Sequence, residues 1–169
     1  DVVLFSGDLA YGGSWDQYER LVKLLTEIQA PVIAAPGNHA YYGWGGYLKL
    51  LGRPYHQVEM GNYQFISLNS GHGRDQLTFS QLNWFENIVR ESAAKYRIVQ
   101  LHHPIQHRPE LSGYLRANRA PLLKIIKESG VAIVLSGHWH GDSVYDITGN
   151  ERVTDADIIG PPFVVTTTA

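Results

Sequence analysis

The sequence contains no cysteine among its 169 residues, and it has no long apolar run. The absence of cysteine excludes disulfide bonds and thiolate metal sites, so any bound metal must be held by oxygen or imidazole ligands. It also favours a secreted or periplasmic protein over one from a reducing compartment. No apolar stretch approaches the ~20 residues that cross a bilayer, so we expect no membrane span.

An excess of charge of one sign is missing as well. The 14 Lys and Arg residues stand against 16 Asp and Glu residues, a formal net charge of −2. Because binders of nucleic acid use a basic surface, we expect no nucleic-acid-binding face. The hydrophobic content of 44% rules out extensive disorder. At roughly 150 residues per domain, the length predicts a single domain spanning residues 1–169; no feature indicates an oligomeric state.

Short apolar runs alternate with amphipathic segments along the chain. Runs rich in β-branched residues predict buried strands, and apolar residues at helical spacing predict helices. Strands are expected at residues 2–5, 31–35, 55–60, 63–68, 97–101 and 131–135. Helices are expected at residues 14–29, 78–92 and 120–129. This alternation indicates an α/β domain with a largely parallel sheet.

Both ends of the sequence carry apolar runs that read as strands. The first run begins at Asp1, and Phe163–Thr168 is followed by Ala169. A buried strand needs neighbours on both sides, and nothing precedes the first one. We therefore expect this chain to be a portion of a longer protein.

Polar residues follow four of the expected strands at the point where each strand ends. In open α/β sheets the carboxyl ends of the strands form the ligand-binding edge, so these residues should meet at one rim. Each motif alone would ordinarily be a turn, but their joint occurrence predicts a metal site that can activate water and neutralise a phosphate. The four motifs are Gly7-Asp8, Gly37-Asn38-His39, His102-His103 and Gly137-His138-Trp139-His140.

Taken in order, these motifs resemble those of the calcineurin-like metallophosphoesterase superfamily. Two segments, Asp8-Leu9-Ala10-Tyr11 and Val99-Gln100-Leu101-His102, are similar to its purple acid phosphatase branch. The resemblance implies an α/β fold of four layers, the αββα metallophosphoesterase sandwich, from which this chain lacks the first strand–helix unit. It implies a metal-dependent phosphoesterase that hydrolyses phosphomonoesters or phosphodiesters by a metal-activated hydroxide.

The resemblance also implies two metal ions, Fe, Zn or Mn, at the top of the sheets. One ion would be held by Asp8, Asn38, His102 and His138. The second ion would share Asp8 and add His140, with Tyr11 if the purple acid phosphatase pattern applies. His138 and His140 are two residues apart, so both can face an ion only in a turn or an extended loop.

The catalytic residue implied by the resemblance is His39, which would contact the phosphate and help the leaving oxygen depart. The family usually has an acid after Gly-Asn-His, and here that position holds Ala40. Such an acid orients the histidine and raises its basicity, so His39 should be a weaker acid catalyst unless another residue substitutes. The family's first motif, Asp-x-His or Asp-x-Gly, is also absent, which leaves the second metal site one or two ligands short.

The candidate substrate-binding residues are His103, Tyr42 and Trp139. His103 follows a ligand, and a substrate contact and a structural role are both open. Tyr42 and Trp139 could stack on an aryl or nucleoside leaving group, or pack against the protein. The expected partner is a small phosphate-ester substrate. The alternative function is a degenerate domain that serves as a binding or scaffold module.

Other aromatic and basic residues are further candidates for contacts with the substrate. For Tyr41 and Tyr47 the favoured interpretation is packing of the loop against the sheet. A phosphate-clamping arginine would have to come from a loop, and the candidates are Arg74, Arg108 and Arg116.

Overall fold

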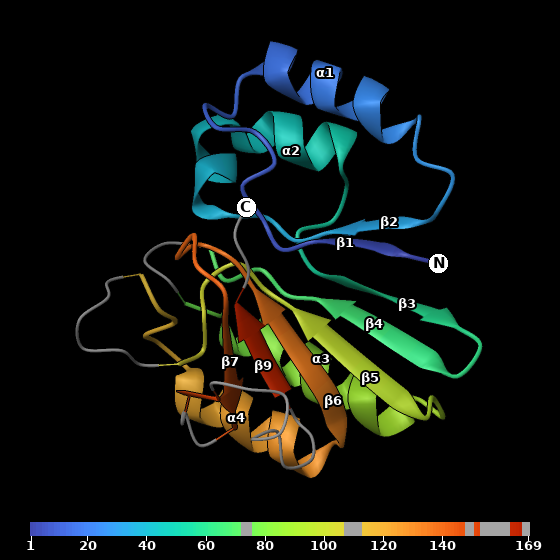
Figure 1. Cartoon of the computed structure of the whole chain (residues 1–169), viewed down its shortest axis with the longest axis vertical. Coiled ribbons are helices and arrows are strands. Elements are labelled where there is room, and N and C mark those ends of the chain that lie inside the picture. The colour runs from blue at the N-terminus through green and yellow to red at the C-terminus, as the bar shows by residue number, and fades with distance from the viewer. Residues whose placement is uncertain (72–75, 107–112, 148–150, 153–162, 167–169) are drawn as a thin grey trace.

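The computed structural model describes residues 1–71, 76–106, 113–147, 151–152 and 163–166. Two sheets, of two and seven strands, lie between helices. Helices α1 and α2 cover the smaller sheet, and α3 and α4 cover the far face of the larger one (Figure 1). This order of layers confirms the predicted αββα sandwich. None of the helices in these ranges is long and apolar enough to span a membrane.

The smaller sheet pairs its two strands in parallel. The elements of this half, in chain order, are β1 (Val3–Phe5), α1 (Trp15–Leu25), β2 (Val32–Ala34), the 3₁₀ helix η1 (Asn38–Gly43) and α2 (Trp44–Leu50).

The larger sheet has the spatial strand order β3-β4-β5-β6-β9-β7-β8. Strands β4, β5, β6 and β9 are mutually parallel, whereas β3, β7 and β8 pair antiparallel. The elements of this half are β3 (His56–Met60), β4 (Tyr63–Ser67), α3 (Phe79–Glu91), β5 (Tyr96–Gln100), α4 (Arg119–Glu128), β6 (Val131–Ser136), β7 (Ser143–Asp146), β8 (Glu151–Arg152) and β9 (Phe163–Thr166).

Helix α1 begins where the sequence predicts and ends earlier. Ser14 caps its first turn in a reciprocal capping box with Gln17, which satisfies backbone N–H groups that lack helical partners. The helix predicted for residues 14–29 ends at Leu25. Beyond Thr26 the backbone closes tighter turns, with Ile28 N donating to Leu25 O at 3.2 Å, and the chain then enters β2.

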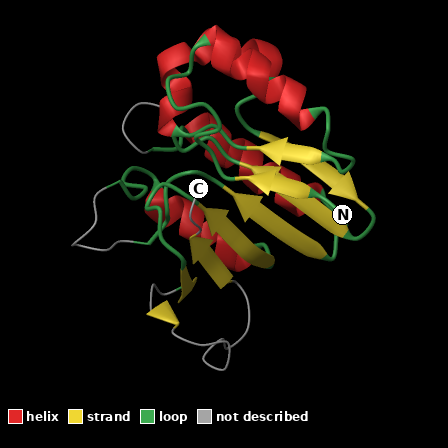
Figure 2. Cartoon of the chain, turned by 45° about the horizontal axis from the view of Figure 1, so that its top comes forward, coloured by secondary structure: helices red, strands yellow, loops and turns green. Residues whose placement is uncertain are grey.

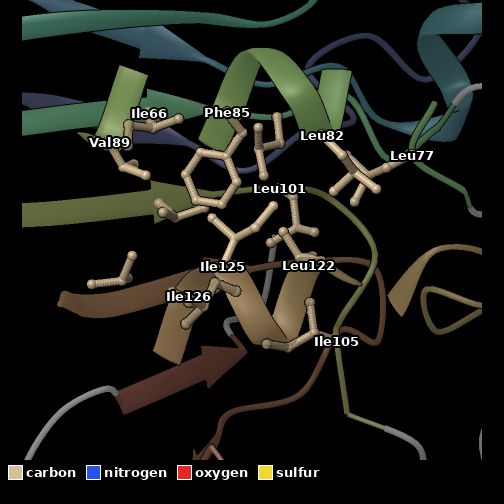
Figure 3. Close-up of a cluster of buried hydrophobic side chains, with 14 of the residues drawn as sticks. Ile66, Leu77, Leu82, Phe85, Val89, Leu101, Ile105, Leu122, Ile125 and Ile126 are labelled. Carbon is tan, nitrogen blue, oxygen red and sulfur yellow. The ribbon is translucent and has the colours of Figure 1, made fainter. Parts of the chain in front are cut away.

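The main core lies between the larger sheet and its two helices (Figure 3). Phe85 of α3 and Leu122 and Ile126 of α4 are fully buried and point toward Leu101, which follows β5. Burying one such side chain contributes roughly 1.5–3 kcal/mol. This packing fixes the carboxyl ends of β5 and β6, from which the site residues project.

Polar side chains join the two sheets. The amide of Gln100 on β5 donates from Nε2 to Ile33 O at 3.0 Å, and Ser67 Oγ on β4 donates to Ala34 O at 3.1 Å. Both side chains are buried, so these bonds satisfy carbonyl groups of β2 that have no access to water. Figure 2 shows that the parallel strands of both sheets end on one side of the molecule.

Candidate metal centre

The imidazole of His102 lies at the centre of a group of metal-ligating atoms. His102 follows β5 and is 1% exposed. Three atoms lie close to its Nε2: Asp8 Oδ2 at 3.1 Å, Asn38 Oδ1 at 3.0 Å and His138 Nδ1 at 3.1 Å. Asp8 and Asn38 follow the strands of the smaller sheet, whereas His102 and His138 follow strands of the larger one. The structure thus brings together the four residues predicted to hold one ion.

The hydrogen bonding of His102 shows that this donor set fits a cation. Its Nδ1 lies 2.9 Å from Ser6 O, and a carbonyl oxygen only accepts, so Nδ1 carries the proton. When Nε2 gives up its own proton, as binding of a cation requires, it presents a lone pair toward a carboxylate oxygen and an amide oxygen. Ligands that bind one ion at 2.0–2.2 Å lie about 3 Å apart when adjacent. Each of the three atoms therefore lies at the distance from Nε2 that an adjacent ligand of the same ion would have.

Asp8 keeps its negative charge in this site. Burial alone would raise the pKa of Asp8, but the hydrogen bond and charge of His102 and the backbone N–H of His39 hold it below its ordinary value. That N–H donates to Oδ1 at 2.9 Å. The ionised carboxylate of Asp8 attracts a cation more strongly than the neutral amide and imidazole groups around it.

Two glycines allow the ligands to approach closely. A Cβ at Gly37 would collide with the carboxylate of Asp8, and a Cβ at Gly113 would collide with the imidazole of His138. Gly113 also has a φ of +77°, which favours glycine. The motif around Gly37 is recognisable from sequence, whereas Gly113 belongs to no motif.

The candidate ligands have unusual backbone conformations. Asp8, His138 and His140 have φ values of 53°, 71° and 51°, a left-handed region that non-glycine residues rarely adopt. Strain of this kind costs about 1–3 kcal/mol and persists where surrounding structure enforces it. His138 and His140 lie in the loop after β6, as their spacing requires. His140 is exposed and lies outside the group around His102, so its role in a second ion site stays a prediction.

His39 is oriented by the main chain. Its Nδ1 donates to the carbonyl oxygen of Tyr11, which leaves Nε2 toward the site, 3.9 Å from Asp8 Oδ2. The carbonyl therefore accepts the hydrogen bond that an orienting acid would accept, and no acid directly follows His39 in this sequence. Ala40 is 4% exposed and belongs to an apolar cluster with Ala10, Tyr18 and Tyr47.

The aromatic loop after His39 divides into a packed part and an exposed part. Trp44 stacks on Tyr41 at 4.3 Å and on Tyr47 at 5.4 Å between ring centroids, which agrees with the packing interpretation. Tyr42 is 72% exposed and Tyr11 is 81% exposed, and both rings contact His39. The assignment of Tyr11 as a ligand of a second ion stays a prediction.

His103 lies within the cluster rather than at its surface. It is 1% exposed, and its ring centroid is 4.5 Å from that of His138. Burial, together with the charges of His102 and His138, lowers the pKa of His103 to about 3, so the ring is neutral. Ser70 Oγ accepts from the backbone N–H of His103 at 2.9 Å and lies 3.2 Å from Nδ1. No sequence motif marks Ser70.

His103 can contribute a ligand atom as well as a substrate contact. Nitrogen atoms of His102, His103 and His138 all lie within 4.8 Å of one another, close enough to hold an ion. Trp139 packs partly buried against the main core, which favours its structural interpretation. Arg116 is exposed, with its guanidinium 5.7 Å from the ring centroid of Tyr114, and Arg74 and Arg108 lie outside the described residues.

Comparison with known proteins gives consistent similarities. Residues 1–142 match the family model described as calcineurin-like phosphoesterase. A probable cyclic nucleotide phosphodiesterase of Synechococcus is 30% identical over 83% of this chain and 58% of that protein. A 3′,5′-cyclic adenosine monophosphate phosphodiesterase of Haemophilus influenzae is 27% identical over 83% of this chain and 54% of that protein. The chain thus spans somewhat more than half the length of these relatives.

Among solved structures, a purple acid phosphatase of yellow lupin seeds has the same fold, with a TM-score of 0.74 and 15% identity. The similarity covers 99% of this chain and 36% of the lupin chain.

Proposed function

The chain belongs to the calcineurin-like phosphoesterase family, and on this basis we propose that it hydrolyses small phosphoric esters with a metal ion held between its two sheets. The observation that carries the proposal is the convergence of Asp8 Oδ2, Asn38 Oδ1 and His138 Nδ1 within 3.1 Å of His102 Nε2. These atoms come from four strand ends that are distant in sequence. A turn with only a structural role would not require them to converge.

Different residues bind the metal ion and donate the proton during hydrolysis. A bound cation supplies Lewis-acid chemistry, because it neutralises phosphate charge and lowers the pKa of water. Asp8, Asn38, His102 and His138 would hold that cation. Water gives one proton to the solvent, its oxygen bonds to phosphorus as the ester P–O bond breaks, and His39 Nε2 gives a proton to the leaving oxygen. Help of this kind is worth ~10²–10⁴-fold in rate.

We also propose a second ion beside Asp8. Its support is His140, which follows His138 by two residues in the same loop. Fe, Zn and Mn all accept this mixture of carboxylate, amide and imidazole ligands.

Cyclic nucleotides are the first substrates to test. Their support is the similarity to proteins named as cyclic nucleotide phosphodiesterases. Such a substrate is a phosphodiester, and opening its ring requires protonation of one ribose oxygen, the role assigned to His39.

Turnover by metal-stripped protein with Mn²⁺, Zn²⁺ or Fe²⁺ restored tests the proposal. The substrates are mono- and bis-nitrophenyl phosphate and 3′,5′-cyclic AMP. We expect metal-dependent turnover that is lost in Asn38→Ala and His138→Ala and retained in Asn83→Ala, a change at an exposed position on α3. A folded protein that binds metal but turns over none of these esters would refute the proposal and favour a binding or scaffold module.

A further inference from the structure

Two exposed tyrosines flank His39. The ring of Tyr11 lies 4.8 Å from the imidazole between centroids, tilted by 31°. The ring of Tyr42 lies 5.5 Å from it and meets it edge to face at 80°. The two rings are 81% and 72% exposed, and both belong to segments that place His39. Two exposed aromatic rings thus lie beside the imidazole that is assigned to protonate the leaving group.

Contacts among the residues that the structure describes leave both rings largely exposed. The neighbouring aromatic residues of the same loop, Tyr41, Trp44 and Tyr47, stack on one another and leave Tyr42 outside the stack. Tyr11 follows Asp8 in the turn after β1, where its carbonyl is used to hold His39 and its ring is left to solvent. A contiguous exposed apolar patch rimmed by polar residues can mark a ligand-binding surface, and here the two rings lie against one imidazole.

We propose that Tyr11 and Tyr42 form an aromatic subsite for the nucleobase of a cyclic nucleotide bound at the metal centre, in which one ring stacks on the base and the other meets it edge to face. The proposal rests on the proposed phosphoesterase function and adds the residues that select the organic part of the substrate. Every nucleobase has a π-face, so stacking of this kind favours planar aromatic groups over aliphatic ones without reading a particular base. Tyr11 then serves twice, with its carbonyl orienting His39 and its ring binding the base.

The test compares two substrates that share one reacting group. These are 3′,5′-cyclic AMP and the 3′,5′-cyclic phosphate of methyl riboside, which has the same diester and no base. In Tyr11→Leu and Tyr42→Leu we expect KM for cyclic AMP to rise about tenfold, the magnitude typical of one base–aromatic stack, while kcat changes little. KM for the base-free diester should stay within twofold. Tyr42→Phe should restore most of the lost affinity, because the ring is retained.

Phe79→Leu is the matched control, since Phe79 is also a strongly exposed aromatic residue, at 69%, but lies at the start of α3. An equal effect of the Leu variants on both substrates would overturn the subsite, since the rings would then only position His39. A loss in Tyr11→Phe as large as in Tyr11→Leu would show that the hydroxyl acts, as a metal ligand would, and would overturn the role given to the Tyr11 ring.

Calorimetric titration separates failure of the subsite from failure of the proposed function. If no protein turns over either ester, the proposed function fails, and cyclic AMP is titrated into the metal-loaded wild type and Leu variants. Binding that weakens about tenfold in Tyr42→Leu and not in Phe79→Leu supports the subsite. Equal binding by all of these proteins, or none by any, overturns it.

Discussion

At position 40 an alanine stands where the family usually has an acid, and the carbonyl oxygen of Tyr11 makes the hydrogen bond to His39 instead. The resemblance to the family predicts a weakened His39 because Ala40 replaces an acid. In the structure the carbonyl of Tyr11 accepts from His39 Nδ1, so the ring is oriented without that acid. A carbonyl carries no full charge, so it fixes the direction of the imidazole but raises its basicity less than a carboxylate would.

We expect Ala40→Glu to destabilise the protein rather than improve catalysis. Ala40 is 4% exposed among Ala10, Tyr18 and Tyr47, so a carboxylate there would be buried without a cationic partner in that cluster. The expected loss is about 2–4 kcal/mol of unfolding free energy, measured by urea denaturation. Ala93→Glu, at an exposed alanine, should change stability by about 0.5 kcal/mol or less. A stable Ala40→Glu protein with a higher kcat would show that the Tyr11 carbonyl does not replace the acid.

Sequence reasoning predicted the candidate site residues that have distinctive side chains. Asp8, Asn38, His102 and His138 occur at recognisable strand ends, and the structure gathers them. The carbonyl that orients His39, the buried Ser70 beside His103 and the close approach of Gly113 to His138 were missed. A main-chain acceptor exists at every position and serine and glycine are common in loops, so the sequence carries no signal that singles these out.

The segment between β4 and α3 is held by side-chain amides. Gln81 of α3 is 2% exposed, its Oε1 accepts from Asn69 N at 2.7 Å, and its Nε2 donates to Asn69 O at 3.0 Å. Asn69 Oδ1 in turn accepts from the hydroxyl of Tyr41 at 2.8 Å. Burial raises the pKa of Tyr41 to about 12, so that hydroxyl keeps its proton and donates. This network fixes Ser70, and through it His103, relative to the loop of His39.

Gln81→Ala should therefore cost about 2–4 kcal/mol of unfolding free energy, because two buried backbone groups of Asn69 lose their partners. Asn83→Ala lies on the exposed side of the same helix and should change stability by about 0.5 kcal/mol or less. Chemical denaturation of the two variants beside the wild type checks the expectation. Equal stabilities would mean that the network contributes nothing to holding the segment.

Helices and strands were predictable where local signals are strong. Ser14 and Thr78 cap α1 and α3, and the hairpin turn at Gly61-Asn62 joins β3 to β4. The end of α1 was placed too late, because residues that follow Leu25 have apolar spacing compatible with a helix but turn toward β2 instead. Helix ends of this kind depend on tertiary contacts that a sequence pattern does not contain.

At the scale of the whole molecule, the candidate metal centre lies at the contact between the two sheets. Asp8 and Asn38 belong to the half that carries β1 and β2, and His102 and His138 belong to the half that carries β5 and β6. The pattern of strand ends predicts that these residues meet at one rim. It does not reveal the buried bonds from Gln100 and Ser67 that hold β2 against the larger sheet.

A cation at this position should stabilise the folded protein against unfolding, because its ligands are separated when the sheets come apart. The most direct measurement is the unfolding free energy of metal-stripped protein before and after Mn²⁺ or Zn²⁺ is added. At a metal concentration of 100 times the Kd, wild type should gain about 2.7 kcal/mol. Asn38→Ala and His138→Ala should lose most of that gain, whereas Asn83→Ala should keep it. A wild type that gains nothing from metal, or a gain that is equal in all of these proteins, would contradict a metal site between the sheets.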